Sequence, residues 1–250
     1  MIIVLPPRRG ILRNLHYNRG GHKAYQGGVR HARPAASTLM AATRIAVLGL
    51  YRSGSSAVAG ALHYLGVDMG RPYWLDHFES ARLAKRLRRW WHEPELEERY
   101  PRTERVRKLG DWIAFLEAGG GAHVGAKHPL LSLCGDDLVE AWGPAVRFIW
   151  TYRPLDESIA SIRRTHWWPE PHGEELQRRL WAPVNQFFAR REHLRIDFAD
   201  MLADPAREIQ RMVDYLGLAP DAAQFAAALA SIRPEKSRGA TDGRHAVAGS

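Results

Sequence analysis

Residues 44–66 read RIAVLGLYRSGSSAVAGALHYLG, and this stretch decides the fold. It begins with a short apolar run that contains β-branched residues, which is typical of a strand buried on both faces of a sheet. YRSGSS then forms a glycine-serine turn, and the small-residue segment that follows predicts a helix closed by Gly66. A strand, a glycine turn and a helix in this order are the usual opening of a parallel α/β sheet.

The rest of the chain continues the alternation of strands and helices. We expect further strands at 123–128, 145–152 and 194–198, and helices near 79–92, 104–118, 134–142, from Pro154, 174–193, 205–216 and 221–231. Residues 43–250 contain no internal repeat and no linker that would divide them. The pattern therefore predicts one α/β domain over 43–250, a three-layer, P-loop-like fold with a central parallel sheet flanked by helices.

The basic character of the chain is concentrated at its N-terminal end. The net charge is +9, and the chain has 36 Lys and Arg residues and 27 Asp and Glu residues. Nine of the basic residues and none of the acidic residues precede Asp68, so from Asp68 onward the two kinds of charge are equal in number. Residues 1–42 show no sustained periodicity, which predicts a basic, flexible N-terminal extension. Met40 begins a run that resembles the start of a compact domain. An alternative to the flexible extension is therefore that the natural chain starts at Met40. Because the chain from Asp68 onward has no net charge, a nucleic-acid partner is not expected.

Composition excludes several classes of protein. The longest apolar runs have about six residues, as at 45–50, whereas a membrane-spanning helix needs roughly 20, so no transmembrane segment is expected. The single Cys134 cannot form an internal disulfide, which favours a reducing, cytoplasmic setting. The 12 histidines form no H-x-x-x-H or H-E-x-x-H pair, and we therefore predict no metal site.

The turn after the first strand has the spacing of a phosphate-binding loop. Gly49 and Gly54 are followed by two serines, and backbone N–H groups ahead of a helix N-terminus bind phosphate. An NTPase with such a loop has lysine directly after the second glycine and an acidic strand end that helps to hold magnesium. Here Ser55 takes the lysine position, the cation stands upstream at Arg52, and the strand at 145–152 is followed by Arg153. The loop is predicted to bind an anion without this ATP machinery.

The sequence RSGSS resembles the 5′-phosphosulfate loop of sulfotransferases that use 3′-phosphoadenosine 5′-phosphosulfate (PAPS). In that family a lysine or arginine precedes Ser-Gly-Thr/Ser-Thr/Ser, and the matching positions are Arg52, Ser53, Gly54, Ser55 and Ser56. The resemblance implies that these residues bind the cofactor, with Arg52 also stabilising charge on the leaving group.

A second part of the resemblance lies at the strand 145–152. The family's 3′-phosphate motif has arginine at the strand end and serine eight residues later, which matches Arg153 and Ser161, although the proline is one position early and leaves Ser158 as a lesser alternative. RPEKSRG at 233–239 loosely resembles the loop that closes over the 3′-phosphate, which makes Lys236 and Arg238 candidates.

Two further segments extend the resemblance over about 45–217. GAKHP resembles a lysine-containing strand end of the family and implies that Lys127 is a second catalytic cation near the sulfonate. The segment from Asp197 to Leu218 resembles the C-terminal strand and helix, with Phe198, Ala199 and Asp200 where Tyr-Glu-Asp is usual.

The resemblance offers two candidates for the base that takes the acceptor's proton. Glu79 follows Phe78 about two dozen residues past the loop, as in bacterial and Golgi members of the family, and is favoured. His128 follows Lys127 and is similar to the histidine of the animal cytosolic members. If its role is not catalytic, Glu79 is expected to be a carboxylate in the first turn of the helix near 79–92.

The implied function is transfer of a sulfonate group from PAPS to a hydroxyl or amine by in-line displacement, without a metal. The acceptor is a small molecule, glycan or lipid that the sequence does not identify, and the oligomeric state is open. We expect Trp90, Trp91, Trp167 and Trp168 either to line the acceptor pocket or to pack in the core or at an interface. Two alternatives remain: a small-molecule kinase that uses ATP and magnesium, and a non-catalytic nucleotide- or polyanion-binding protein.

Overall fold

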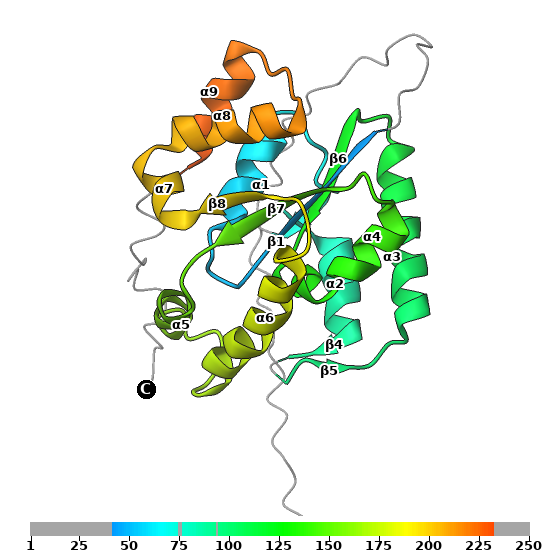
Figure 1. The fold of residues 1–250 in the computed structure, drawn as a ribbon, viewed down its shortest axis with the longest axis vertical. Helices are drawn as coiled ribbons and strands as arrows, with labels where there is room; N and C mark the ends of the chain where they lie inside the picture. Colours follow the sequence, from blue (N-terminus) through cyan, green and yellow to red (C-terminus); the bar gives the residue numbers. More distant parts are fainter. Residues whose placement is uncertain (1–41, 75–76, 94, 233–250) are drawn as a thin grey trace, which may run out of the picture. The chain divides into compact units, whose positions relative to one another are not determined.

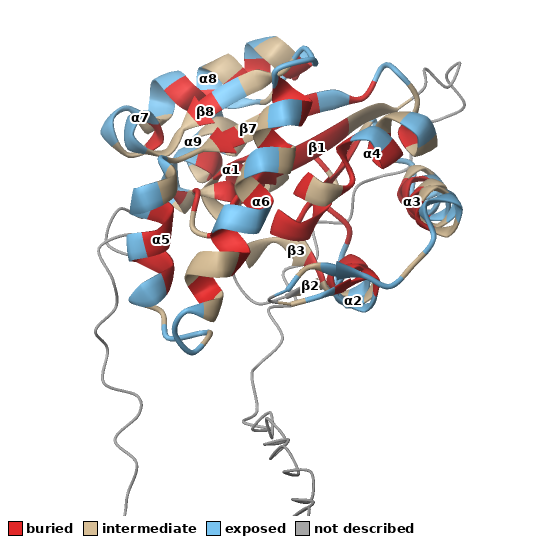
Figure 2. Ribbon diagram, turned by 60° about the horizontal axis from the view of Figure 1, so that its bottom comes forward, coloured by how far each residue is buried: buried red, intermediate tan, exposed pale blue. Residues whose placement is uncertain are grey.

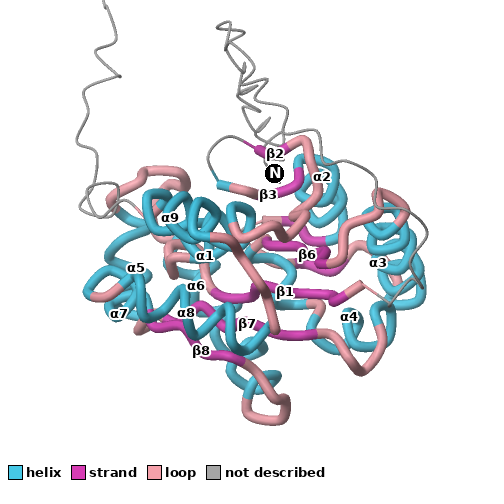
Figure 3. The backbone as a smooth tube through the Cα atoms, turned by 90° about the horizontal axis from the view of Figure 1, so that it is seen from above, coloured by secondary structure: helices cyan, strands magenta, loops and turns pink. Residues whose placement is uncertain are grey.

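A four-stranded parallel sheet forms the centre of the structure, a computed structural model that describes residues 42–232 apart from 75, 76 and 94. The order across the sheet is β6-β1-β7-β8 (Figure 3). The strands span Thr43–Gly49 (β1), His123–Lys127 (β6), Arg147–Tyr152 (β7) and Leu194–Asp197 (β8). The predicted fold class, a parallel α/β sheet flanked by helices, is confirmed. The predicted extension at 1–42 lies outside the described residues except at its last position.

Helices cover both faces of this sheet (Figure 1). Helices α1, α8 and α9 contribute to the core on one face, and α2, α3, α4 and α6 to the core on the other. Their bounds are Ser55–Tyr64 (α1), Ala81–Trp90 (α2), Arg102–Glu117 (α3), Gly135–Trp142 (α4), Leu155–Arg163 (α5), His172–Phe188 (α6), Phe198–Ala203 (α7), Pro205–Leu216 (α8) and Ala222–Ser231 (α9).

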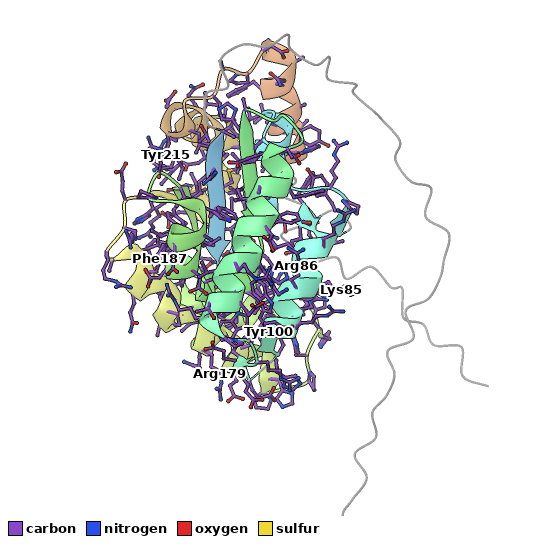
Figure 4. The ribbon with its side chains drawn as sticks, turned by 90° about the vertical axis from the view of Figure 1, so that its right-hand side faces the viewer. Lys85, Arg86, Tyr100, Arg179, Phe187 and Tyr215 are labelled. Carbon is purple, nitrogen blue, oxygen red and sulfur yellow. The ribbon has the colours of Figure 1, made fainter. Side chains whose placement is uncertain are left out.

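The alternation of side chains along β1 produces the two cores. Ile45 and Val47 belong to the α1/α8/α9 side, and Ala46 and Leu48 to the other, because successive strand residues point to opposite faces. All four are fully buried, and burial is concentrated along the central strands (Figure 2). Phe187 of α6, labelled in Figure 4, meets Phe148 of β7 edge-on with 4.9 Å between the ring centroids.

Small elements complete the described part of the chain. Two short antiparallel pairs join β2 (Tyr73–Trp74) with β3 (Glu79–Ser80), and β4 (Trp91–His92) with β5 (Glu97–Glu98). A 3₁₀ helix, η2, spans Pro129–Leu133 directly after β6. No described helix is both long and apolar enough to cross a membrane.

Two element boundaries differ from the prediction in ways that matter. The helix expected near 79–92 begins at Ala81, because the Ser80 hydroxyl accepts a hydrogen bond from the Leu83 N–H and caps the helix. Glu79 therefore lies in β3, and the expectation that it is a first-turn helix carboxylate is wrong. The helix expected at 174–193 ends at Phe188, and the last segment before β8 is a turn.

Candidate active site

The residues predicted to bind phosphate lie at the C-terminal edge of the sheet. β1, β6 and β7 are parallel neighbours, with Val47 paired to Lys127 and Gly49 paired to Thr151, so the segments after these strands emerge at one edge. This edge is where open α/β sheets bind their ligands.

The predicted phosphate loop, residues 49–56, is stabilised by hydrogen bonds to a network of hydroxyl groups. The Ser53 hydroxyl donates to the Leu50 carbonyl over 2.7 Å and lies 2.9 Å from the Thr151 hydroxyl. The Ser132 hydroxyl accepts from the Gly49 N–H at 2.9 Å and donates to the Gly49 carbonyl at 3.0 Å. The side chain of Ser53 is thus committed to supporting the loop, and Ser132, which the motif does not include, shares that role.

The second glycine of the loop is required by both conformation and space. Gly54 has φ 88°, in the left-handed region, and a Cβ atom there would lie 2.4 Å from the Phe198 ring. α1 begins at the next residue, has no side-chain cap and carries no acidic residue in its first turn. The positive end of α1 therefore faces the loop without a neutralising carboxylate.

Arg52, Arg153 and Ser161 meet beside the loop. Arg52 Nε donates to the Ser161 hydroxyl at 3.2 Å, and Arg153 Nη1 donates to the Arg52 carbonyl at 3.1 Å. Arg52 has φ 63°, so it occupies a strained left-handed conformation. Burial, followed by the charges of Arg153 and Arg164, lowers the pKa of Arg52, but a guanidinium keeps its proton in proteins. Two predicted cofactor arginines are therefore in direct contact.

The hydrogen bond from Arg52 also distinguishes Ser161 from Ser158, the two serines predicted as candidates for the 3′-phosphate. Ser161 lies against Arg52, whereas the fully buried Ser158 hydroxyl has no hydrogen-bond partner among the described residues. Gln177 of α6 donates to the carbonyls of Tyr51 (2.7 Å) and Ser158 (3.4 Å), which ties the loop to α5.

A pocket of about 230 Å³ adjoins Arg153. It is lined by the ends of β7 and β8 and the residues after them: Tyr152, Arg153, Pro154, Glu157, Asp197, Phe198, Ala199 and Asp200. The Arg153 guanidinium lies over the Phe198 ring at 4.7 Å and reaches Glu157 at 3.2 Å. Aromatic and charged groups here offer stacking and hydrogen bonding to a planar polar ligand.

Lys127, at the end of β6, joins the loop to the favoured candidate base. Its Nζ donates to Glu79 Oε1 at 2.7 Å, to the Ser56 hydroxyl at 3.0 Å and to the His77 carbonyl at 3.4 Å. Burial lowers the pKa of Lys127 and Glu79 opposes this effect, while the charge of Arg52 adds to the lowering. Burial raises the pKa of Glu79, but Lys127 and then His128 outweigh it, and the net shift is downward.

His128 is buried behind this ion pair. Its Nδ1 accepts a hydrogen bond from the Leu130 N–H at 3.1 Å, and its Nε2 lies 3.9 Å from Glu79 Oε2. Burial lowers the pKa of His128 to about 4, more strongly than Glu79 raises it. The ring is therefore neutral near pH 7, its single lone pair is used by η2, and its N–H faces Glu79.

Tyr51 and Glu93 form a contact that sequence reasoning missed. The Tyr51 hydroxyl donates to Glu93, and its ring meets Trp168 edge-on at 5.3 Å and His128 at 6.4 Å. Burial and then Glu93 raise the pKa of Tyr51 well above its usual value, and burial also raises the pKa of Glu93. The only available signal was the position of Tyr51 directly before Arg52.

The remaining predictions concern the tryptophans, two C-terminal basic residues and the metal site. Trp90 and Trp91 are buried in the core, whereas Trp167 is half exposed and Trp168 partly buried. Lys236 and Arg238 lie outside the described residues. Among residues 42–232, apart from the gaps, no group of three His, Cys, Asp or Glu side chains is arranged to hold a metal ion.

Comparison with known proteins supports the fold. No family model matches the chain, and no curated protein matches it. The sulfotransferase domain of the Synechococcus PCC 7002 olefin synthase superposes with a TM-score of 0.52 at 16% identity, over 83% of this chain and 86% of that one. A sulfotransferase from Mycobacterium tuberculosis H37Rv gives 0.47 at 16% identity, over 79% and 76%.

A sugar kinase from Janibacter sp. HTCC2649 gives a TM-score of 0.48 at 18% identity, over 72% of this chain and 97% of that one. The likeness to the olefin synthase domain shows that the protein has the P-loop-like fold of sulfotransferases, as the loop motif predicts. Because the identities are low, this likeness concerns the fold, and the activity has to be argued from the site.

Proposed function

We propose that this protein is a sulfotransferase that transfers a sulfonate group from PAPS to a hydroxyl or amine of an acceptor. The observation that carries the proposal is the position of Lys127, whose ammonium contacts both the phosphate-loop residue Ser56 and the carboxylate of Glu79. A buried cation between an anion-binding loop and a carboxylate is suited to group transfer from an anionic donor to a proton-bearing acceptor.

The residues at the sheet edge fit the donor's charge. Three cations, Arg52, Lys127 and Arg153, lie around the loop, and the N-terminus of α1 adds a partial positive charge. PAPS supplies an activated sulfonate, and its transfer breaks the bond from sulfur to the 5′-phosphate oxygen. We assign its 5′ end to the loop and Lys127, its 3′-phosphate to Arg153 and Ser161, and its nucleoside to the adjoining pocket.

We assign the base to Glu79. Its pKa is held below the usual range, so it is ionised at neutral pH and can accept a proton, whereas the lone pair of His128 is engaged by the Leu130 N–H. The same ion pair makes Glu79 a weak base as long as Lys127 has no other anion to bind. We infer that a donor anion near Lys127 strengthens Glu79 as a base, because it withdraws part of the stabilisation of the carboxylate.

The proposal is tested by product analysis. The protein is incubated with PAPS, a chelator and a mixed panel of phenols, sugars, lipid alcohols and amines, and the products are examined by mass spectrometry. We expect an acceptor that gains one sulfonate, with 3′-phosphoadenosine 5′-phosphate (PAP) formed in equal amount, and a slower reaction for Arg153→Ala.

The two alternatives give different results. A phosphorylated product that forms only with ATP and magnesium would identify the kinase. Nucleotide binding without transfer to any member of the panel would favour the non-catalytic binding protein. Either result would contradict the proposal.

A further inference from the structure

Trp167 is exposed, whereas several other tryptophans of the described residues are buried. Half of its surface, 50%, is open to solvent, whereas Trp90, Trp112 and Trp142 are at most 2% exposed. Ligand sites are commonly lined by large aromatic rings beside a few polar groups, so the groups that surround this ring indicate whether it suits a ligand.

The Trp167 ring lies beside Arg52 and His77. The Arg52 guanidinium carbon is 5.4 Å from its ring centroid, and the His77 ring is 6.3 Å away. The His77 carbonyl, in turn, accepts a hydrogen bond from Lys127 Nζ. Trp167 thus lies between the cation of the phosphate loop and the residues that lead to Glu79.

The segment that carries Trp167 is pre-organised. The Thr165 hydroxyl donates to the Ile162 carbonyl at 2.6 Å and accepts from the Trp167 N–H at 3.4 Å. His166 adopts φ 52°, a strained conformation that surrounding contacts must hold in place. The neighbouring Trp168 packs edge-on against Tyr51 at 5.3 Å. The backbone that carries the indole is therefore held in position before any ligand arrives.

We propose that Trp167 is the acceptor platform and that it selects an uncharged hydroxyl compound built on a six-membered ring. This inference rests on the proposed function. One face of the acceptor ring lies on the indole, and its hydroxyl points to Glu79. Aromatic rings and pyranose sugars both present a flat apolar face, whereas a linear alcohol covers less of the indole. The guanidinium of Arg52 beside Trp167 disfavours a protonated amine.

The test measures binding, so it needs no turnover. The protein is saturated with PAP and titrated by NMR with three probes: 2-naphthol for the aromatic class, methyl β-D-glucopyranoside for the sugar class and 1-butanol as the linear alcohol. The variants are Trp167→Ala and Trp167→Phe. Phe115→Ala is the matched control, since Phe115 of α3 is 51% exposed and has the Arg82 guanidinium 5.2 Å from its ring.

We expect at least one ring probe to bind more tightly than 1-butanol. Trp167→Ala should weaken that probe at least ten-fold, Trp167→Phe should stay within about three-fold, and Phe115→Ala should bind as the unchanged protein does. Tighter binding of 2-naphthol would identify the acceptor as an aromatic alcohol, and tighter binding of the glucopyranoside would identify it as a sugar.

Several results would overturn the inference. These are equal binding of all three probes, no binding of either ring probe, or an unchanged affinity in Trp167→Ala. A loss of PAP affinity as large as the loss of probe affinity would instead assign Trp167 to the nucleotide. Failure of the unchanged protein to bind PAP would contradict the proposed function itself, and the same titration reports it separately.

Discussion

Lys127 and Glu79, 48 residues apart, form an ion pair in which Nζ and Oε1 are 2.7 Å apart, and the same ammonium contacts Ser56 of the phosphate loop at 3.0 Å. Lys127 is 2% and Glu79 12% exposed at their side chains, so water screens the pair only weakly. Glu79 and the loop residue Ser56 therefore share one cation, and we infer that a donor anion bound at the loop would compete with Glu79 for it.

This competition predicts that Glu79→Gln affects donor binding and turnover in opposite directions. Removal of the carboxylate leaves Lys127 free for the ligand's anion, so we expect PAP to bind about three- to ten-fold more tightly. Turnover should fall at least about a hundred-fold, because a general base contributes typically 10²–10⁴-fold. Calorimetry gives the first quantity and steady-state assays the second.

Glu175→Gln is the control for that experiment, since it removes an exposed ion pair with Arg179 on α6. It should leave both quantities unchanged. Weaker PAP binding in Glu79→Gln would show that the carboxylate supports the donor site instead of competing with it. If Glu79→Gln stays active while His128→Ala loses turnover, the base is His128.

Arg52 and Arg153 should act on the nucleotide as a coupled pair. Each single alanine variant is expected to lose about 1.5–3 kcal/mol of PAP binding, roughly ten- to a hundred-fold. Because Arg153 donates to the Arg52 carbonyl and Arg52 contacts Ser161, the double variant should depart from additivity by about 0.5–3 kcal/mol. Calorimetry on the four proteins measures this coupling, and additive losses would contradict it.

The two arginines should also differ in selectivity. Arg153→Ala is expected to reduce discrimination between PAP and AMP, which lacks the 3′-phosphate, more than Arg52→Ala does. An equal loss of discrimination in both variants would show that the contact of Arg52 with Ser161 persists when the nucleotide is bound.

Gly54→Ala tests the packing of the loop against Phe198. A left-handed residue with a Cβ costs roughly 1–2 kcal/mol, and the forced contact with the ring should add about 1–3 kcal/mol. Gly120→Ala is the matched control, because Gly120 has φ 82° and nothing within 4 Å of the added atom. Urea unfolding should show a clearly larger loss for Gly54→Ala. Equal losses would mean that the ring moves aside at little cost.

His128 should make the stability of the fold depend on pH. Burial lowers its pKa from 6.5 to about 4, so between these values the unfolded chain binds a proton that the folded chain does not. The free energy of unfolding is therefore highest above pH 6.5 and decreases as pH falls toward 4, by roughly 3 kcal/mol in total. In His128→Asn, which retains an acceptor for the Leu130 N–H, urea unfolding across this range should show a shallower slope. An unchanged slope would rule out a buried neutral histidine.

The parts of the site that lie at strand ends could be predicted from the sequence. Arg52 and Arg153 each follow a short apolar run, and parallel strands bring such ends to one edge whatever their separation in the chain. The same reasoning predicted the four strands of the sheet and most of its helices, because long periodic segments carry their own signal. Lys127 was predicted from the resemblance of GAKHP to a strand end of the family.

Contacts between distant side chains could not be predicted in this way. The Tyr51–Glu93 hydrogen bond, the support of Gly49 by Ser132 and the link from Gln177 to the loop join residues that no local pattern relates. Two-residue strands such as β3 form only through tertiary contacts, so Glu79 was expected in a helix. The six-residue helix α7 was missed because so short a helix has little intrinsic signal.

The central claim, a donor site for a 3′-phosphorylated nucleotide, is tested most directly by calorimetry of the unchanged protein without added metal. We predict that PAP binds under these conditions and that AMP binds at least ten-fold more weakly, since Arg153 and Ser161 then have no 3′-phosphate to hold. ATP with magnesium should bind more weakly than PAP. Tighter binding of ATP with magnesium than of PAP would contradict the account.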